Sequence, residues 1–299
     1  MALTDKLTAI GDAIRAKTGT EDKFTLDEMA TAIEGIKGGG GGENSLAQIA
    51  AGTSDDIVCE DATYLSDRLF NGDALCPKRI ILPNVTSIYS DNFFTSYGIT
   101  RYLEEIELGL SVVPSYCFED AGYLKKAVFN KAYQVNNDAF AYNEKLEQFV
   151  GENVTQVGGS AFGYTESLES VNMPLLRTVG ERAFIQSGLK RAVFPNLSSV
   201  SQYAFAACLN MEYADLNGGG QFRSSAFQEC VALKALVIRN TTVVTTMDWD
   251  ALYDSNIEDG DGYIYVYRTM LDRYKSATNW VRYADKFRAI EDYPDICGG

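Results

Sequence analysis

The chain has 299 residues, of which 46% are hydrophobic, 22% are charged and six are proline, a composition typical of a folded globular protein. Its 26 basic and 41 acidic residues give a net charge of -15, which repels phosphate backbones and excludes a typical nucleic-acid-binding surface. The chain has no histidine, so a catalytic triad, a histidine general base or a zinc site is hard to build, and we expect no enzyme activity and no metal site.

Residues 1–37 are predicted to form a helical hairpin. Apolar residues recur at helical spacing in the first helix, at Leu3, Leu7, Ile10 and Ile14. A capping box at residues 25–28 opens the second helix, whose apolar stripe is Met29, Ile33 and Ile36. A hairpin of this size is too small to be stable alone. We therefore expect these seven residues to form an assembly contact with another copy of the chain or a partner protein, although docking on the rest of the chain stays open.

Residues 38–44 are predicted to be a flexible linker, because five consecutive glycines begin at Gly38. The linker would separate a small anchoring module from a large presenting module.

Residues 45–262 are predicted to form one repeat domain, which begins with a short capping segment. The first signature of the repeat is an aliphatic residue followed five positions later by phenylalanine. The phenylalanines are 25, 22, 22, 22, 21 and 22 residues apart, at Phe93, Phe118, Phe140, Phe162, Phe184, Phe205 and Phe227. Regular spacing at this period is typical of repeat architectures.

A second signature, Leu-x-x-Φ-x-Φ with Φ apolar, follows each phenylalanine. It begins at Leu103, Leu124, Leu146, Leu168, Leu189, Met211 and Leu233. The Φ-x-Φ spacing predicts a short strand with both apolar residues on one face. Together the two signatures predict about nine coils of ~22 residues that stack and line their interior with apolar ladders, including one ladder of the seven phenylalanines.

Residues 263–299 are predicted to be a C-terminal α/β cap. A strand with alternating aromatics is expected at 262–266, a short helix at 270–277 and a last strand near 287–290. A stack of coils needs such a cap to cover its open apolar end and its strand edge.

The form V-x4-A-F followed by C-x-x-L resembles the BspA-type leucine-rich repeat. Cys208 and Cys230, each three residues after a phenylalanine, match its frequent cysteine position. The resemblance covers roughly residues 60–260 and implies an α+β leucine-rich-repeat solenoid, with these cysteines as small buried residues. The family is similar to surface adhesins and to repeat proteins of phages and mobile elements.

Both terminal segments resemble structural proteins of phages that infect Gram-positive gut bacteria. Tail and fibre-associated proteins of these phages have N-terminal segments similar to LTAIGDAIRAKTGTEDKFTLDEMATAI. A C-terminal segment common in the same proteins is similar to YIYVYRTMLDRYKSATNWVRYADKFRAI, except that Tyr267 stands where that pattern has a proline. The resemblance implies a phage tail or fibre protein.

Tyrosine provides the candidate recognition surface, because several of the 18 tyrosines fall at variable repeat positions. They are Tyr89, Tyr97, Tyr102, Tyr116, Tyr142, Tyr164 and Tyr203. Tyrosine offers rigid contact area with a polar tip. The alternative interpretation is that these tyrosines only fill space between coils.

These observations favour a non-enzymatic phage tail-associated protein, a fibre or receptor-binding component, whose repeat surface recognises the host cell. Expected partners are other virion proteins at the N-terminal module, further copies of the chain, and a host cell-surface glycan or protein; no cofactor is expected. Two alternatives stay open: a virion spacer or decoration protein without a receptor, and a bacterial surface adhesin.

The N-terminus lacks the basic region and apolar core of a secretory signal, and no stretch has the ~20 apolar residues of a membrane span. We therefore expect synthesis in the cytoplasm of a bacterial host and a final location in the virion.

Overall fold

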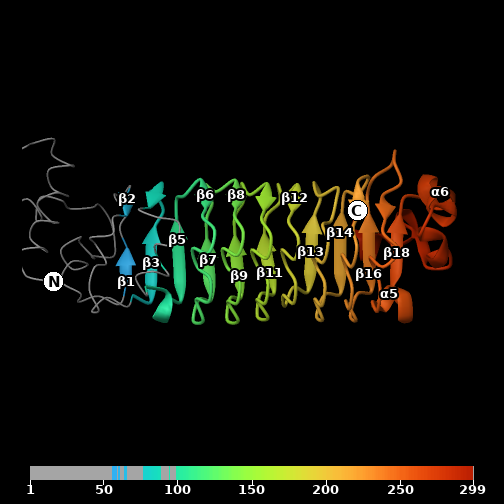
Figure 1. Cartoon of the computed structure of the whole chain (residues 1–299). Coiled ribbons are helices and arrows are strands. Elements are labelled where there is room, and N and C mark those ends of the chain that lie inside the picture. The colour runs from blue at the N-terminus through green and yellow to red at the C-terminus, as the bar shows by residue number, and fades with distance from the viewer. Residues whose placement is uncertain are drawn as a thin grey trace, which may run out of the picture.

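The chain forms a rod of stacked coils (Figure 1). The computed structural model describes residues 56–58, 60, 64–65, 77–88, 94 and 99–298. The rod is a β-solenoid of about nine turns with few helices, which confirms the predicted solenoid. The predicted helical hairpin and the glycine linker lie outside the described residues.

The longer strand of each coil joins a parallel sheet along one side of the rod (Figure 1). In the N-terminal part these strands are β1 (Asp56–Val58), β3 (Arg79–Leu82), β5 (Glu105–Leu108), β7 (Lys126–Val128), β9 (Gln148–Val150) and β11 (Ser170–Asn172). In the C-terminal part they are β13 (Arg191–Phe194), β14 (Tyr213–Leu216), β16 (Ala235–Ile238), β18 (Tyr263–Val266) and β19 (Phe287–Ala289). Within each part the pairing brings one repeat position beside the same position of the next coil.

Two-residue strands form a second side of the rod. They are β2 (Tyr64–Leu65), β4 (Ser87–Ile88), β6 (Val112–Val113), β8 (Gln134–Val135), β10 (Gln156–Val157), β12 (Thr178–Val179), β15 (Gln221–Phe222) and β17 (Thr246–Met247). From β6 to β15 each ends at the leading residue of the first signature, whose side chain is buried in the core. In the coil that contains β4, a 3-10 helix, η2 (Ile99–Tyr102), precedes the next long strand, β5.

Side chains of the long strands alternate between the core and the outer face of the sheet, as the Φ-x-Φ spacing predicts. In β13, Ala192 and Phe194 are buried, whereas Arg191 and Val193 are exposed. Burial of one face of every strand in a common interior is the main favourable contribution to the stability of the stack.

Phenylalanine rings run as one column through this core. Neighbouring ring centroids are 5.2 to 5.4 Å apart and the rings are within 4° to 9° of parallel, in the order Phe118, Phe140, Phe162, Phe184, Phe205 and Phe227. On the N-terminal side the ring that contacts Phe118 belongs to Phe94, with centroids 4.8 Å apart. Phe93, the residue that the spacing predicts, lies outside the described residues.

The loops that hold these rings are hydrogen-bonded from coil to coil. Around Phe140, the amides of Asp138, Phe140 and Tyr142 each donate to a carbonyl of the next coil, at 2.9, 2.8 and 2.9 Å. We call the loop that carries each phenylalanine the arch. It requires left-handed backbone two residues before and two residues after the phenylalanine, with φ of 55° at Asp138 and 62° at Tyr142. Six successive coils repeat both conformations with residues other than glycine, so the arch carries a local strain that the ladder and the buried rings offset.

A row of buried residues with polar or thiol side chains lies three positions after each phenylalanine from Phe140 to Phe227: Asn143, Thr165, Ser187, Cys208 and Cys230. Three of them donate to backbone carbonyls: Thr165 Oγ1 to Phe162 O at 2.7 Å, Cys208 Sγ to Phe184 O at 3.1 Å, and Cys230 Sγ to Phe205 O at 3.1 Å. Cys208 and Cys230 are fully buried, as predicted. Burial raises the pKa of the Cys208 thiol to about 11, so this thiol stays protonated at neutral pH and serves packing.

The C-terminal cap continues the sheet and closes the core. It contains β18 and β19 together with α5 (Asn256–Asp259), η3 (Arg268–Met270), α6 (Leu271–Ser276) and η4 (Trp280–Tyr283). Trp280 is fully buried, with its ring centroid 6.1 Å from that of Phe222, and its Nε1 donates to Thr245 O at 2.6 Å. Figure 1 shows the helices of the cap at the far end of the rod. The strand, helix and last strand lie where the sequence predicts them.

Candidate recognition surface

Charged side chains on the outer face of the N-terminal sheet form a row of alternating sign. Asp56, Arg79, Glu105 and Lys126 lie side by side on successive strands. Arg79 pairs with Asp56 at 3.3 Å and with Glu105 at 3.0 Å, and Lys126 pairs with Glu105 at 2.7 Å. The hydrogen bond from Lys126 is the main cause that lowers the pKa of Glu105. Because these charges pair with one another, the row offers little net charge to a ligand.

The C-terminal end of the chain covers the outer face of β14, β16 and β18. This segment contains η5 (Ile290–Asp292) and α7 (Pro294–Cys297). Its Ile290 and Cys297 join a second apolar cluster on the outside of the sheet, together with Val237 and Tyr265. This part of the sheet face is therefore closed to a partner.

An ion pair anchors the same segment. Arg239 donates from Nε to Asp215 Oδ1 at 2.7 Å and from Nη2 to Asp215 Oδ2 at 2.6 Å, and Nη2 also donates to the carbonyl of Cys297. Tyr213 donates its hydroxyl to Asp215 at 2.9 Å. Burial, followed by the charge of Asp215, raises the pKa of Tyr213 to about 12, so this hydroxyl remains a donor.

The predicted tyrosines occupy three rows on the rod. Those in the described part of the chain are Tyr102, Tyr116, Tyr142, Tyr164 and Tyr203; the others, Tyr89 and Tyr97, lie outside it. Tyr116 and Tyr203 precede a phenylalanine by two residues, Tyr142 and Tyr164 follow one by two residues, and Tyr102 immediately precedes a leading leucine. Tyr102, Tyr116 and Tyr142 are about half exposed, whereas Tyr164 and Tyr203 are partly buried.

Neighbouring coils bring some of these tyrosines into contact. Tyr142 and Tyr164 stack with centroids 4.8 Å apart and rings 7° from parallel. The guanidinium of Arg182 lies 4.9 Å from the ring centroid of Tyr203, within range of a cation–π interaction.

The row that contains Tyr102 also contains Tyr123, which the sequence analysis missed. The rings of Tyr102 and Tyr123 are 6.1 Å apart, and Lys145 Nζ lies 3.8 Å from the centroid of Tyr123. We call this row, which continues through Ser167 and Asn210, the edge row. Tyr123 could have been found from its position immediately before Leu124, which matches that of Tyr102 before Leu103.

One coil is a residue shorter than its neighbours, and the shortening is confined to the bend before the long strand. Phe184 and Leu189 are five residues apart, whereas the corresponding residues are six apart in the coils on either side. Gly188 alone occupies this bend, and a Cβ placed there would lie 2.1 Å from the carbonyl oxygen of Glu166. No other residue fits this main-chain path without displacing the neighbouring coil.

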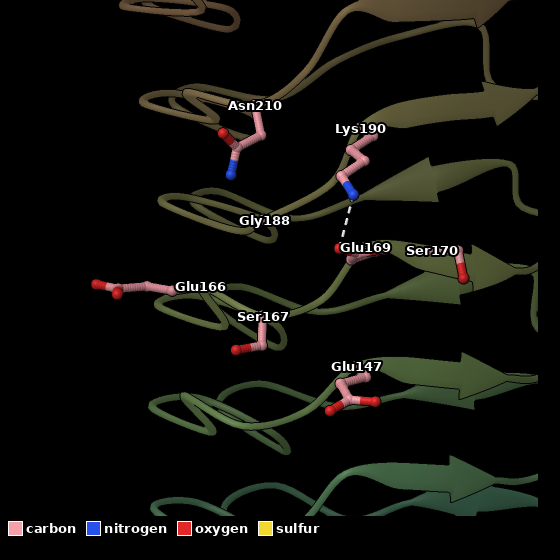
Figure 2. A pocket seen from close by; sticks show the side chains of 8 residues that line it. All are labelled: Glu147, Glu166, Ser167, Glu169, Ser170, Gly188, Lys190 and Asn210. Carbon is pink, nitrogen blue, oxygen red and sulfur yellow. Dashed lines mark hydrogen bonds and ion pairs between the residues drawn. The ribbon is translucent and has the colours of Figure 1, made fainter.

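A hollow of about 500 Å³ lies at this shortened bend. Figure 2 shows side chains of four coils around Gly188, which itself has no side chain. We call it the short-coil hollow; its lining includes Glu147, Glu166, Ser167, Glu169, Lys190 and Asn210. Lys190 pairs with Glu169 at 2.6 Å, whereas Glu147 and Glu166 have no ion pair within 4.0 Å among the described residues.

The residues predicted to make the assembly contact lie outside the described part of the chain; they are Leu3, Leu7, Ile10, Ile14, Met29, Ile33 and Ile36. Among the residues that the structure describes, no cluster of three acidic or cysteine side chains is arranged to hold a metal ion. Within the same residues, no helix is both long and apolar enough to span a bilayer.

Comparisons with known proteins identify several similar chains. Solved structures that the chain resembles include a leucine-rich repeat protein from Bacteroides ovatus (18% identity, TM-score 0.39, 52% of this chain and 43% of that chain) and a leucine-rich cell surface protein from Faecalibacterium prausnitzii (15%, 0.39, 64% and 67%). The pneumococcal vaccine antigen PcpA is similar at 18% identity and TM-score 0.38, over 72% of this chain and 63% of that chain. The chain thus spans about two fifths to two thirds of these proteins, and no curated protein sequence matches it.

The repeat itself gives the assignment. A family model that describes the BspA type leucine-rich repeat region, in six copies, matches residues 57–169 and 155–261. These two matches cover the whole stack of coils between its first strand and the cap. The chain belongs to the BspA-type leucine-rich repeat family.

Proposed function

We propose that this chain is a non-enzymatic recognition protein whose solenoid presents rows of exposed side chains to a partner. The observation that carries the proposal is the combination of a rigid, continuous core with variable outward positions. The arch positions that hold Tyr142 and Tyr164 hold Asp120, Gln186 and Glu229 in other coils, so the coil itself does not require tyrosine there. Side chains that the fold does not require are available for binding.

We further propose that the protein is associated with a phage tail, as a fibre or receptor-binding component. The resemblance of both terminal segments to phage structural proteins supports this role. In it, the apolar residues of 1–37 attach the chain to other virion proteins or to further copies of itself, and the linker 38–44 gives reach. The solenoid then faces a host cell-surface glycan or protein, and the protein is located in the virion after synthesis in the host cytoplasm.

Deletion of residues 1–42 tests the attachment step. Phage particles produced in the presence of the shortened chain should not contain that chain, because residues 1–37, the proposed anchoring module, have been removed. Mass spectrometry of purified particles measures this. A chain with the five glycines replaced by serine, which keeps the linker flexible, is the matched control and should be incorporated normally. Normal incorporation of the deletion variant would refute attachment through this module.

Binding to host cells separates recognition from a purely structural role. The labelled full-length chain should bind susceptible cells and should compete with particle adsorption. A chain that is incorporated into particles but binds no cells would be a spacer or decoration protein.

A bacterial surface adhesin is the second candidate, because surface proteins occur in the same repeat family. An adhesin would be found in the cell-envelope fraction of uninfected bacteria and would be absent from purified phage particles.

A further inference from the structure

The shortened bend at the short-coil hollow is a fixed feature of the main chain. In the coils on either side, two residues fill the corresponding bend: Glu166 and Ser167 before it, Leu209 and Asn210 after it. Between them stands only Gly188, whose Cβ position is blocked by the backbone of Glu166. The absence of a side chain at this bend is therefore fixed by the main chain, whereas exposed side chains such as Glu166, Lys190 and Asn210 form the walls of the hollow.

The unpaired charge of the lining is negative. Carboxylates of Glu147, Glu166 and Glu169 accept hydrogen bonds but do not donate them, whereas Ser167, Ser170 and Asn210 can do both. The only cationic side chain of the lining, Lys190, is already engaged by Glu169 at 2.6 Å (Figure 2). The carboxylates without an ion pair, Glu147 and Glu166, favour a ligand that supplies donors, which hydroxyl and ammonium groups do. The surplus of acceptors and the net charge of -15 repel phosphate and carboxylate groups.

The edge row leads from Tyr102 along the rod into the short-coil hollow. Tyr102 and Tyr123 are 47% and 48% exposed, and the row continues through Lys145 to Ser167 and Asn210 on the rim. Five coil steps separate its two ends, which corresponds to ~24 Å at ~4.8 Å per step. Exposed tyrosine rings offer apolar area with a polar tip, although Lys145 covers one face of Tyr123. The row and the hollow together thus form an extended surface that suits a ring-shaped, hydroxyl-rich chain.

We propose that the edge row and the short-coil hollow bind an oligosaccharide that carries free amino groups, with an amino sugar in the hollow and the neighbouring sugar rings along the tyrosines. This inference rests on the proposed recognition function and names the ligand class. An open hollow with this polar lining is unsuited to a lipid or another apolar ligand. Hydrogen bonds between ammonium groups and carboxylates are stronger than neutral ones, so an amino sugar is preferred to its acetylated form.

The test uses the full-length chain and three oligomers of equal length: glucosamine, N-acetylglucosamine and galacturonic acid. We expect glucosamine oligomers to bind more tightly than N-acetylglucosamine oligomers in isothermal titration, and galacturonic acid oligomers not to bind. The variant Glu147→Gln/Glu166→Gln should weaken glucosamine binding about tenfold, which corresponds to about 1.4 kcal/mol. Insertion of one asparagine between Ser187 and Gly188, which restores the usual coil length, should abolish binding.

Matched variants distinguish this site from general attraction to an acidic protein. Glu144→Gln/Glu212→Gln removes the same charge at the same two repeat positions, at residues that do not line the hollow, and should leave affinity within about twofold. Tyr123→Ala should weaken binding, whereas Tyr133→Ala, which removes an equally exposed ring from another side of the rod, should not. Circular dichroism of each variant shows that the coil stack is retained.

The outcomes separate the ligand from the function. Equal losses in both glutamate double variants, or no binding of glucosamine oligomers, would overturn the proposed ligand. Cell binding by the full-length chain that these oligomers do not compete for, and that persists in the hollow variants, would overturn the site while recognition itself stands. A wild-type chain that binds no host cells overturns the proposed function, whereas the titrations still report directly on the hollow.

Discussion

Single phenylalanine side chains couple neighbouring coils, because each ring in the column contacts the ring before it and the ring after it. Phe184→Ala should therefore lower the free energy of unfolding by about 3–5 kcal/mol, through lost burial and the cavity left between two rings. Urea unfolding followed by circular dichroism measures the change. Tyr133→Ala, at a half-exposed position, is the control and should change stability by less than about 1 kcal/mol. A similar small effect of Phe184→Ala would contradict the role of the column.

The left-handed Asp138 gives a prediction with a definite pH dependence. Burial is the main cause that raises the pKa of its carboxyl group, and the hydrogen bond from Tyr116 opposes it. The folded state then binds this proton more readily than the unfolded state, so the carboxylate lowers stability above the folded pKa. This penalty disappears as the pH falls through that value and then the unfolded one.

Asp138→Asn should consequently raise the free energy of unfolding at neutral pH and have little effect near about pH 3, where the wild-type carboxyl is protonated. Asparagine tolerates left-handed backbone, so the arch is kept. Denaturant titrations at both pH values provide the measurement. The same substitution at Asp120, which is also left-handed, is the control. Stabilisation by Asp138→Asn of equal size at both pH values would rule out the carboxylate as its cause.

Among the elements, the C-terminal segment 290–297 depends on one ion pair. Arg239→Ala leaves Asp215 in an almost closed site without its cation, and should cost about 2–3 kcal/mol, less than a fully buried pair because the arginine is partly exposed. The segment should also detach locally, because its carbonyl anchor at Cys297 is lost.

Cysteine labelling reports this detachment. Burial raises the pKa of the Cys297 thiol to about 11, and the side chain is 1% exposed, so the wild-type thiol should react slowly. In Arg239→Ala, alkylation of Cys297 should be at least about tenfold faster, as followed by peptide mass spectrometry, since local opening controls access. Arg239→Lys should show an intermediate rate, because lysine restores the charge without the two parallel bonds. Equal rates in all three proteins would exclude this anchor.

The strands of the solenoid could be predicted from sequence because their inward positions recur within one coil. Leu189, Ala192 and Phe194, for example, mark one strand by spacing alone. The outward contacts could not be predicted, because they depend on what lies beside each position in the next coil. Val237 looks like one more apolar strand residue, yet it is buried on the outer face by a segment more than 50 residues later in the chain.

The candidate site shows the same limit. The interval of 21 residues between Phe184 and Phe205 is visible in the sequence, but its consequence required knowledge of where in the coil the missing residue falls. Tyr123 was missed for a related reason: it gains its significance from Tyr102 and Lys145 in the adjacent coils.

At the scale of the whole molecule, the rod needs its cap. Deletion of residues 263–299 would expose the Phe222 end of the core and the edge of β16. The truncated chain should associate in a concentration-dependent way beyond any assembly of the full chain, as sedimentation velocity would show. Trp280→Ala, which keeps both strands of the cap, should destabilise the protein by about 3–5 kcal/mol with less association. A truncated chain that stays folded and no more associated than the full chain would contradict this role.

The coil that contains Gly188 is one residue short, yet the rings of Phe162, Phe184 and Phe205 remain 5.2 and 5.3 Å apart and within 6° of parallel across it. A change in chain length at this bend is thus absorbed locally, because each coil packs mainly against its immediate neighbours. Gain or loss of single codons at such bends can then reshape the outside of the protein without altering its interior. Relatives that face different surfaces are expected to differ there in length as much as in residue identity.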